Sequence, residues 1–292
     1  MDKKTILLFS SAGAIILGII IFTIALIVGM QNKPVNIATI DLTNDMAYDL
    51  LEGYCNVKEK KAKEYVSSYS VSDAYKKIIE EDTEVVLATD IDQDTLDWIK
   101  ANNVEVEITP IAKDAIVFFN NNQNPVTNLT VNNIKDIYSA KVTNWSEVGG
   151  ENLDIIAYPP KEDTEEVYML TKFMGSRNVA KPGLRIPDVT VTKVYDAVSK
   201  YLDTRKKAIG YTTYNNSKNI TDYDNVRTLS INGVVPTDES IRSGEYAGAM
   251  NIYAIIKKDT PVNSQTRNFV NYILSQNGQD IINEGGYINL SK

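Results

Sequence analysis

Histidine and cysteine, which serve most often as general base, thiol nucleophile and zinc ligand, are almost absent from this chain. It contains no histidine and a single cysteine, Cys55. Without histidine, a histidine-based catalytic triad and a histidine-ligated zinc site are excluded, and one cysteine cannot form an intramolecular disulfide. We therefore expect no enzymatic activity, no cofactor and no metal site. We interpret Cys55 as a small buried apolar residue.

Hydroxyl and carboxylate side chains instead gather where helices are expected to begin. Three segments share this composition: Asp41-Leu42-Thr43-Asn44-Asp45, Ser70-Val71-Ser72-Asp73 and Asp163-Thr164-Glu165-Glu166. Such side chains cap helix N-termini by accepting hydrogen bonds from the first backbone amides, and Asp163 with Glu166 has the spacing of a capping box. Taken alone, these segments predict self-capped helices, with Thr43 or Asn44 as one cap and Ser72 as another.

Length and charge narrow the class of protein. The 292 residues suffice for one large domain or for two lobes. The net charge is −8, which argues against nucleic acid as a partner because phosphate backbones require clustered lysine and arginine.

Short apolar segments alternate with helical segments along the whole chain, which predicts an α/β fold with largely parallel strand pairing. The expected strands are 35–40, 85–88, 104–109, 115–119, 153–158, 208–214 and 249–256. The expected helices are 45–54, 71–79, 95–101, 131–141 (capped by Thr130), 164–174, 189–201, 263–277 and 279–283.

The stretch from Ile108 to Gly150 carries a family resemblance. This stretch resembles the phosphate-binding protein of bacterial phosphate ABC transporters in the order of its segments. An apolar strand follows Pro-Ile-Ala-Lys-Asp, and then come Asn-Pro-Val, a Thr-capped helix and Thr-Asn-Trp before Val-Gly-Gly. Segments 208–214, 229–246 and 269–290 are similar to the closing segments of that family. The resemblance implies a two-lobed clamp of the periplasmic-binding-protein type II class. Its first lobe would be discontinuous, with residues 35–115 and 250–292, and its second lobe would be residues 116–249.

The same resemblance implies a set of ligand-binding residues in a cleft between the lobes. Asp90 stands where the family has an acid that accepts the proton of hydrogen phosphate. Thr43 and Asn44 follow the first strand, Ser72 lies at the start of the next helix, and Thr164 lies at the start of the helix near residue 165. The implied ligand-binding residues are Thr43, Asn44, Ser72, Asp90 and Thr164.

Several positions depart from the family pattern, so we expect a degenerate ligand site. Pro160 stands where the family has a permanently charged arginine, and Asp73, Glu165 and Glu166 replace glycine or hydroxyl residues. At ~4 Å and an effective dielectric constant near 20, each contact between like charges costs about 4 kcal/mol. Lys161 is the candidate substitute cation.

The N-terminus reads as a membrane segment. Thr5–Met30 has no charged residue, and a helix of about 26 residues exceeds the ~30 Å hydrocarbon layer. Lys3 and Lys4 precede the segment, which favours a cytoplasmic N-terminus and an exported domain. We expect a retained single-span anchor at residues 1–30 with a linker at 31–34; a cleaved signal peptide is the alternative.

These observations predict a membrane-anchored, extracytoplasmic solute-binding protein. Phosphate is the ligand that the resemblance implies, and an ABC transporter permease is the implied partner. Two alternatives stay open. The first is a domain that has lost phosphate binding and acts at the cell surface in sensing or protein interaction. The second is a domain whose acidic site binds a cationic or polar ligand.

Overall fold

The structure is a computed structural model that describes residues 32–80, 82–91, 93–158, 165–175, 206–218 and 225–290. The predicted membrane segment, the predicted helix 189–201 and the predicted ligand residue Thr164 lie outside these ranges. Among the helices within them, none combines the length and the apolar character needed to cross a membrane.

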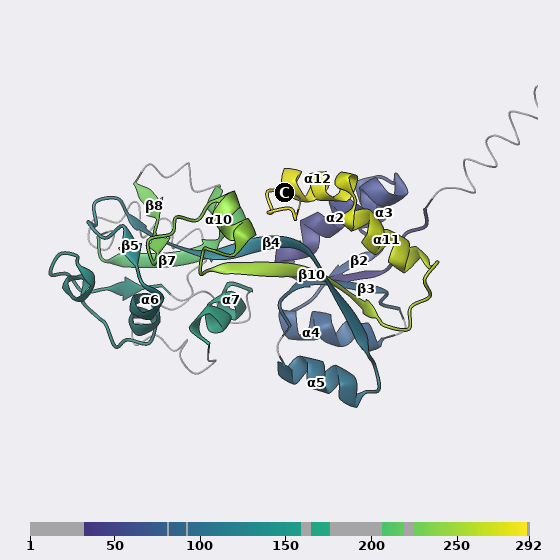
Figure 1. The fold of residues 1–292 in the computed structure, drawn as a ribbon, viewed down its shortest axis with the longest axis horizontal. Coiled ribbons are helices and arrows are strands. Elements are labelled where there is room, and N and C mark those ends of the chain that lie inside the picture. Colours follow the sequence, from purple (N-terminus) through teal and green to yellow (C-terminus); the bar gives the residue numbers. More distant parts are fainter. Residues whose placement is uncertain are drawn as a thin grey trace, which may run out of the picture.

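Two long strands join two lobes (Figure 1). β4 (Val106–Asn121) leads out of the first lobe and β10 (Ala249–Lys257) returns to it. β4 pairs with β10 as far as Ala115 and then, from Ile116, with β7 (Ala208–Thr213). From this change of partner we infer that the chain passes between the lobes next to Ala115; the lobe boundaries expected from the sequence stay a prediction.

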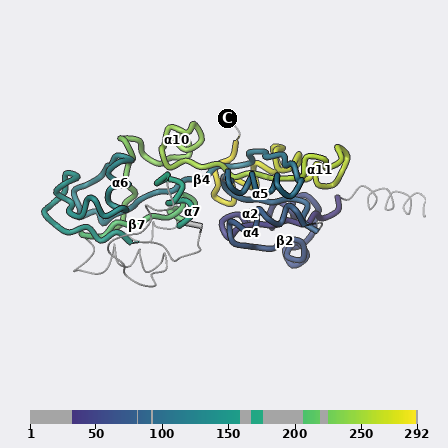
Figure 2. The backbone as a smooth tube through the Cα atoms, turned by 90° about the horizontal axis from the view of Figure 1, so that it is seen from below, coloured from purple at the N-terminus to yellow at the C-terminus, as the bar shows by residue number. Residues whose placement is uncertain are grey.

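The first lobe is one sheet between two layers of helices, with strand order β2-β1-β3-β10-β4 (Figure 1). Seen from below, the two lobes lie side by side (Figure 2). The other elements of the first lobe, in chain order, are β1 (Ile37–Thr39), α2 (Asp41–Cys55), α3 (Glu59–Ala62), β2 (Val66–Ser68), α4 (Val71–Lys76) with a following 3-10 turn (Lys77–Ile79), β3 (Val85–Thr89), α5 (Gln93–Ala101), α11 (Gln265–Leu274) and α12 (Gln276–Glu284).

Strand β3 shows how the sequence produces this layered arrangement. All five of its residues are buried. Val85 and Leu87 pack with α2, α11 and α12 on one face, whereas Val86 and Ala88 pack with α4 and α5 on the other. Because helices cover both faces, the strand reads as a continuous apolar segment and not as an alternating one.

The second lobe continues the sheet through β4, β7 and β6, and β8 adds to β4. Its further elements are β5 (Asn128–Leu129), α6 (Val131–Tyr138), a 3-10 turn (Trp145–Val148), β6 (Ile156–Ala157), α7 (Glu165–Met174), α9 (Tyr214–Ser217), β8 (Val226–Thr228), β9 (Ser230–Ile231) and α10 (Asp238–Ser243). The prediction that Thr130 caps the helix after it is confirmed: Thr130 Oγ1 accepts a hydrogen bond from Asn133 N at 3.0 Å.

Two expectations about the strands are wrong. The predicted strands 104–109 and 115–119 are one strand, β4, which contains Pro110. The pairing of β4 with β10 shifts register between Ile252 and Tyr253, opposite this proline, and such a bulge accommodates a residue that lacks an amide hydrogen. The pairing is also mixed and not largely parallel, because β4 and β10 run antiparallel to their neighbours.

The C-terminal segment makes a further connection between the lobes. Tyr287 is buried in the core of the first lobe, and the next residue, Ile288, is fully buried in the core of the second. Ile288 exchanges two backbone hydrogen bonds with Lys113 of β4, at 2.8 and 2.9 Å. Arg242 of α10 donates to Asn289 O at 3.2 Å. The C-terminal end of the chain accordingly lies between the two lobes (Figure 1).

Candidate functional site

Three parallel strands of the first lobe end at the same edge of the sheet. β1 pairs in parallel with β2 and with β3, so that Thr39 lies between Ser68 and Leu87. The segments that follow these strands, namely the start of α2, the start of α4 and Asp90, therefore lie together. Ligands of α/β folds bind outside the carboxyl ends of such strands. We call this edge, together with the part of α7 that contacts Asp90, the interlobe face.

The helix after β1 begins earlier than the sequence predicts. α2 starts at Asp41, directly after Ile40, and not at Asp45. The expectation that Thr43 or Asn44 is the N-cap is therefore wrong. The physical reason is that Thr43 sits inside the first turn, where its Oγ1 accepts a hydrogen bond from Ile40 N at 3.3 Å.

Thr43 and Asn44 both bond within the first lobe. Thr43 is fully buried, and its hydroxyl donates to Leu87 O at 2.6 Å. Asn44 Oδ1 accepts from the hydroxyl of Thr39 at 3.0 Å. Their assignment as ligand-binding residues stays a prediction.

Ser72 lies at the start of α4 with its side chain exposed, but it is not the cap. The N-cap is Ser70, which accepts from Asp73 N at 3.3 Å and donates to the Asp73 carboxylate at 3.0 Å. Asp73 also pairs with Lys76 at 2.9 Å. The hydrogen bonds from Lys76 and Ser70 hold the pKa of Asp73 below its ordinary value. The expectation that Ser72 caps this helix is wrong, whereas its ligand role stays a prediction.

Asp90 makes contacts with both lobes. Its carboxylate pairs with the ammonium group of Lys172 on α7 and accepts a hydrogen bond from the Tyr253 hydroxyl on β10. Burial, and then the bond to Asp90, raises the pKa of Tyr253. The Tyr168 hydroxyl, one helical turn before Lys172, donates to the backbone oxygen of Asp90. The pair is only partly solvated, since the side chains of Lys172 and Asp90 are 40% and 19% exposed.

Lys172 is the residue that sequence reasoning missed at this face. Its position on α7 shows only a lysine in an amphipathic helix, and no local signal brings it to the end of β3. Lys161, the substitute cation that the sequence suggests, lies in the segment 159–164, outside the described ranges. The structure thus places a cation opposite Asp90, eleven positions later in the chain than expected.

The chemistry available at the interlobe face is hydrogen bonding and charge pairing. Hydroxyls, a carboxylate and an ammonium group can bind a small polar solute and orient it. No group of acidic or cysteine side chains in the described ranges is arranged to hold a metal ion.

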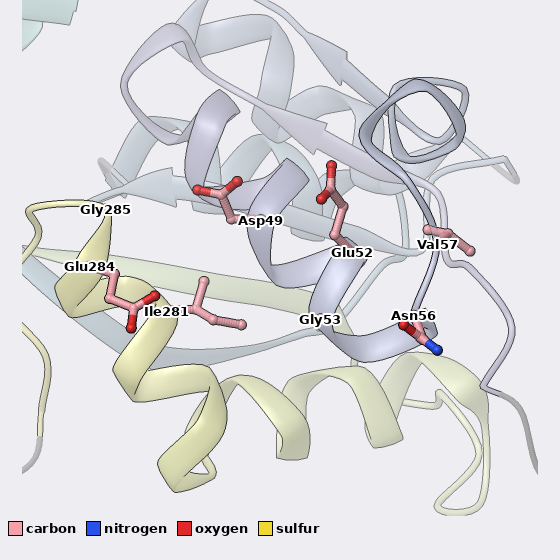
Figure 3. Close-up of a pocket in the computed structure, with 8 residues that line it drawn as sticks. All are labelled: Asp49, Glu52, Gly53, Asn56, Val57, Ile281, Glu284 and Gly285. Carbon is pink, nitrogen blue, oxygen red and sulfur yellow. The ribbon is translucent and has the colours of Figure 1, made fainter.

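A separate hollow of about 500 Å³ lies between α2 and α12, on the first lobe (Figure 3). Three of its lining residues are acidic: Asp49, Glu52 and Glu284. Burial, and then repulsion by neighbouring carboxylates including Glu284, raises the pKa of Asp49. These carboxylates repel one another and face no cation that lines the hollow, so the hollow has no feature of an anion site.

One glycine beside this hollow packs the helices together. A Cβ atom at Gly53 would lie 2.5 Å from the Tyr272 hydroxyl oxygen and 2.6 Å from Ile281 Cδ1. Although alanine in a helix interior is worth about 0.5–1 kcal/mol relative to glycine, overpacking costs about 1–3 kcal/mol. We expect Gly53→Ala to lower the free energy of unfolding, measured in urea, by about 1 kcal/mol. Gly285→Ala is the matched control, because its Cβ would meet no atom closer than 3.5 Å. A Gly53→Ala protein as stable as the Gly285→Ala protein would contradict this packing.

Comparison with known proteins shows which protein family this chain matches. The family model described as "PBP superfamily domain" matches residues 34–277. Among curated proteins, the phosphate-binding protein PstS of Borreliella burgdorferi is 26% identical over 185 residues, which cover 62% of this chain and 65% of that protein. The matched part thus spans less than two thirds of that relative. By its name it is a binding protein and not an enzyme.

Solved structures share the fold. An ABC-type phosphate transport receptor from Vibrio cholerae superposes with a TM-score of 0.68 at 21% identity, covering 87% of this chain and 99% of that one. A Clostridium perfringens protein assigned to phosphate ABC transport and solved with bound phosphate gives a TM-score of 0.65 at 23% identity, covering 89% of this chain and all of that one. At such identities the likeness establishes the two-lobed α/β fold.

Proposed function

Because the chain belongs to the PBP superfamily, we propose that it is an extracytoplasmic solute-binding protein that takes a small oxyanion between its lobes, with phosphate as the first candidate. The observation that carries this proposal is the meeting of Asp90 with Lys172 at the carboxyl ends of three parallel strands. A carboxylate beside an ammonium group suits an oxyanion that still carries a proton. The oxyanion accepts a hydrogen bond from the lysine, and its O–H group donates a hydrogen bond to the carboxylate. The phosphate-binding relatives support the choice of ligand.

The proposal extends to the membrane and to a transporter. The uncharged segment Thr5–Met30 would anchor the domain, and a permease of the ABC transporter type would receive the solute. If the segment is an anchor, the full chain should stay in the membrane fraction after an alkaline carbonate wash. Release of the full-length chain by that wash would argue against anchoring, and recovery of a chain shortened by the segment would indicate a cleaved signal.

A second candidate is a domain of the same fold that no longer binds phosphate. The observation that favours it is that hydroxyl and carboxylate groups at the interlobe face already have partners within the chain: Thr43 with Leu87, Asn44 with Thr39, and Asp90 with Lys172. A ligand that binds through these same groups would compete with these contacts.

Thermal unfolding of the full chain separates the two candidates. A ligand at 100 times its Kd adds about 2.7 kcal/mol, which corresponds to about 4–5 °C for a protein of this size. We expect phosphate to raise the melting temperature in this way, and sulfate and alkylamines to raise it less. No shift with phosphate but a shift with an amine or another polar solute would indicate a changed ligand. No shift with any of them would favour the domain that has lost binding.

A further inference from the structure

One ion pair connects the two lobes away from the strands that join them. Lys172 belongs to α7 of the second lobe, and Asp90 directly follows β3 of the first. In Figure 1, α7 lies on one side of the β4–β10 pair, and the C-terminal end of the chain lies on the other. The Tyr168 hydroxyl bonds the backbone of the same Asp90, so that two successive turns of α7 attach to one residue of the first lobe.

The pair is placed where it can act on lobe opening. β4 and β10 form a continuous antiparallel connection with a bulge beside Tyr253, and the C-terminal segment holds the lobes together on its side through Ile288 and Arg242. Separation of the lobes on the side of α7 must therefore break the contacts of Lys172 and Tyr168 with Asp90. Partly exposed ion pairs are modest in strength, which suits a contact that forms and breaks reversibly.

We propose that Lys172 is the specificity-determining cation of the interlobe face and acts as a latch: it pairs with Asp90 when no ligand is bound and turns to an anionic ligand when one enters. That the ligand is an anion rests on the proposed function, whereas the contact of Lys172 with Asp90 as a latch does not rest on it. Lys172 neutralises Asp90 in the empty protein, and it then supplies the positive charge that an oxyanion beside Asp90 requires.

The latch is tested without any ligand by measuring the distance between the lobes. Spin labels are placed on exposed positions by Asp94→Cys on α5 and Asn132→Cys on α6; Cys55 is buried and does not compete. In the full chain, Lys172→Met should lengthen and broaden the distance distribution, with a two- to fivefold change in the ratio of open to closed protein. Lys172→Arg should leave the distribution as it is. Lys141→Met is the matched control, because Lys141 lies 3.8 Å from Asp136 within the second lobe.

The charge role is tested by titrating the same variants with inorganic phosphate. A hydrogen bond to a charged group is worth about ten- to a hundredfold in affinity, so Lys172→Met should weaken phosphate binding by that factor and Lys172→Arg by much less. If the distance distribution of Lys172→Met equals that of the unmodified chain, the latch is overturned. If its phosphate affinity is also unchanged, the whole inference fails while the proposed function stands. If the unmodified chain binds no phosphate but Lys172→Met opens the lobes, the latch stands and the phosphate proposal fails.

Discussion

Asp114→Asn should remove a fall in stability that the unmodified protein shows as the pH rises from about 4 to about 7. Asp114 lies on β4 beside the lobe boundary and is 1% exposed. Its Oδ1 accepts from the backbone amides of Ala115 at 2.7 Å and Asn215 at 3.1 Å, whereas Oδ2 has no hydrogen-bond partner among the described residues. Burial raises the pKa of Asp114 from 3.8 to about 7, against the opposing effects of these amides and of Lys218.

The sign of the effect follows from the two states. The unfolded chain loses the Asp114 proton near pH 4, whereas the folded chain keeps it until about pH 7. The stability that the protonated group contributes is therefore complete below pH 4 and is lost as the pH rises through 7. At about 1.4 kcal/mol per pKa unit, this loss amounts to at most about 4 kcal/mol.

Urea unfolding at pH 4.5, 6 and 7.5 measures this loss. The unmodified chain should lose stability across the series, and Asp114→Asn, which keeps an oxygen for the two amides, should lose much less. Asp94→Asn, at an exposed position of α5, is the control and should follow the unmodified chain. Parallel pH profiles for the unmodified chain and the Asp114→Asn protein would show that Asp114 ionises in the folded state as it does in the unfolded one.

Ile288→Ala should lower the free energy of unfolding by about 2–5 kcal/mol, the range for an isoleucine truncated in a packed core. Ile288 is 0% exposed and lies in the core of the second lobe, although the helix before it belongs to the first. Its loss leaves a cavity in the second lobe and loosens the C-terminal segment. Val262→Ala, at a side chain that is 79% exposed, should change stability by less than about 0.5 kcal/mol.

Amide hydrogen exchange would locate the effect of Ile288→Ala. We expect faster exchange in β4 and β7 of the second lobe, and little change in β1 and β3 of the first. Tyr287→Phe should remove the hydrogen bond from the Tyr287 hydroxyl to Leu42 O, at a cost of about 1 kcal/mol. Unfolding free energies of Ile288→Ala and Val262→Ala that agree within error would contradict the role of Ile288 in joining the two cores.

Local signals predicted local structure well. The apolar segment 85–88 lies in β3, which is continuously apolar there because helices cover both of its faces. The segment 208–214 contains β7, whose six residues are all buried. Thr130 identified the start of α6, since the capping bonds join residues three positions apart. The assignment of Cys55 to the interior is also confirmed; burial raises the pKa of its thiol to about 11.

Features that depend on contacts between residues far apart in the chain could not be predicted from local sequence patterns. Pro110 lies within β4 only because a bulge forms in its pairing with β10, more than a hundred residues later. The α2 helix begins at Asp41 because Thr43 bonds to Leu87 of another strand as well as to Ile40. Lys172 reaches Asp90 only because α7 lies against the end of β3, which no pattern within the helix reveals.

The candidate site shows the same division. The resemblance to the phosphate-binding family implied a ligand cleft between the lobes, lined by Thr43, Asn44, Ser72, Asp90 and Thr164. The topology of β1, β2 and β3 places the segments of the first four residues at one edge of the sheet, and their role as ligand-binding residues stays a prediction. Whether each side chain contacts a ligand is a separate matter, since Thr43 is buried and Ser72 is exposed. The positive charge opposite Asp90 comes from Lys172, which the resemblance does not supply.

Calorimetric titration of the full chain with inorganic phosphate at neutral pH tests the central claim most directly, because it measures affinity and stoichiometry together. We predict saturable heat with one phosphate bound per chain, and binding of sulfate that is at least about tenfold weaker, a difference of about 1.4 kcal/mol. Absence of heat with phosphate in a chain that unfolds cooperatively would contradict the claim, and would mean that the fold is kept for another ligand or for a protein partner.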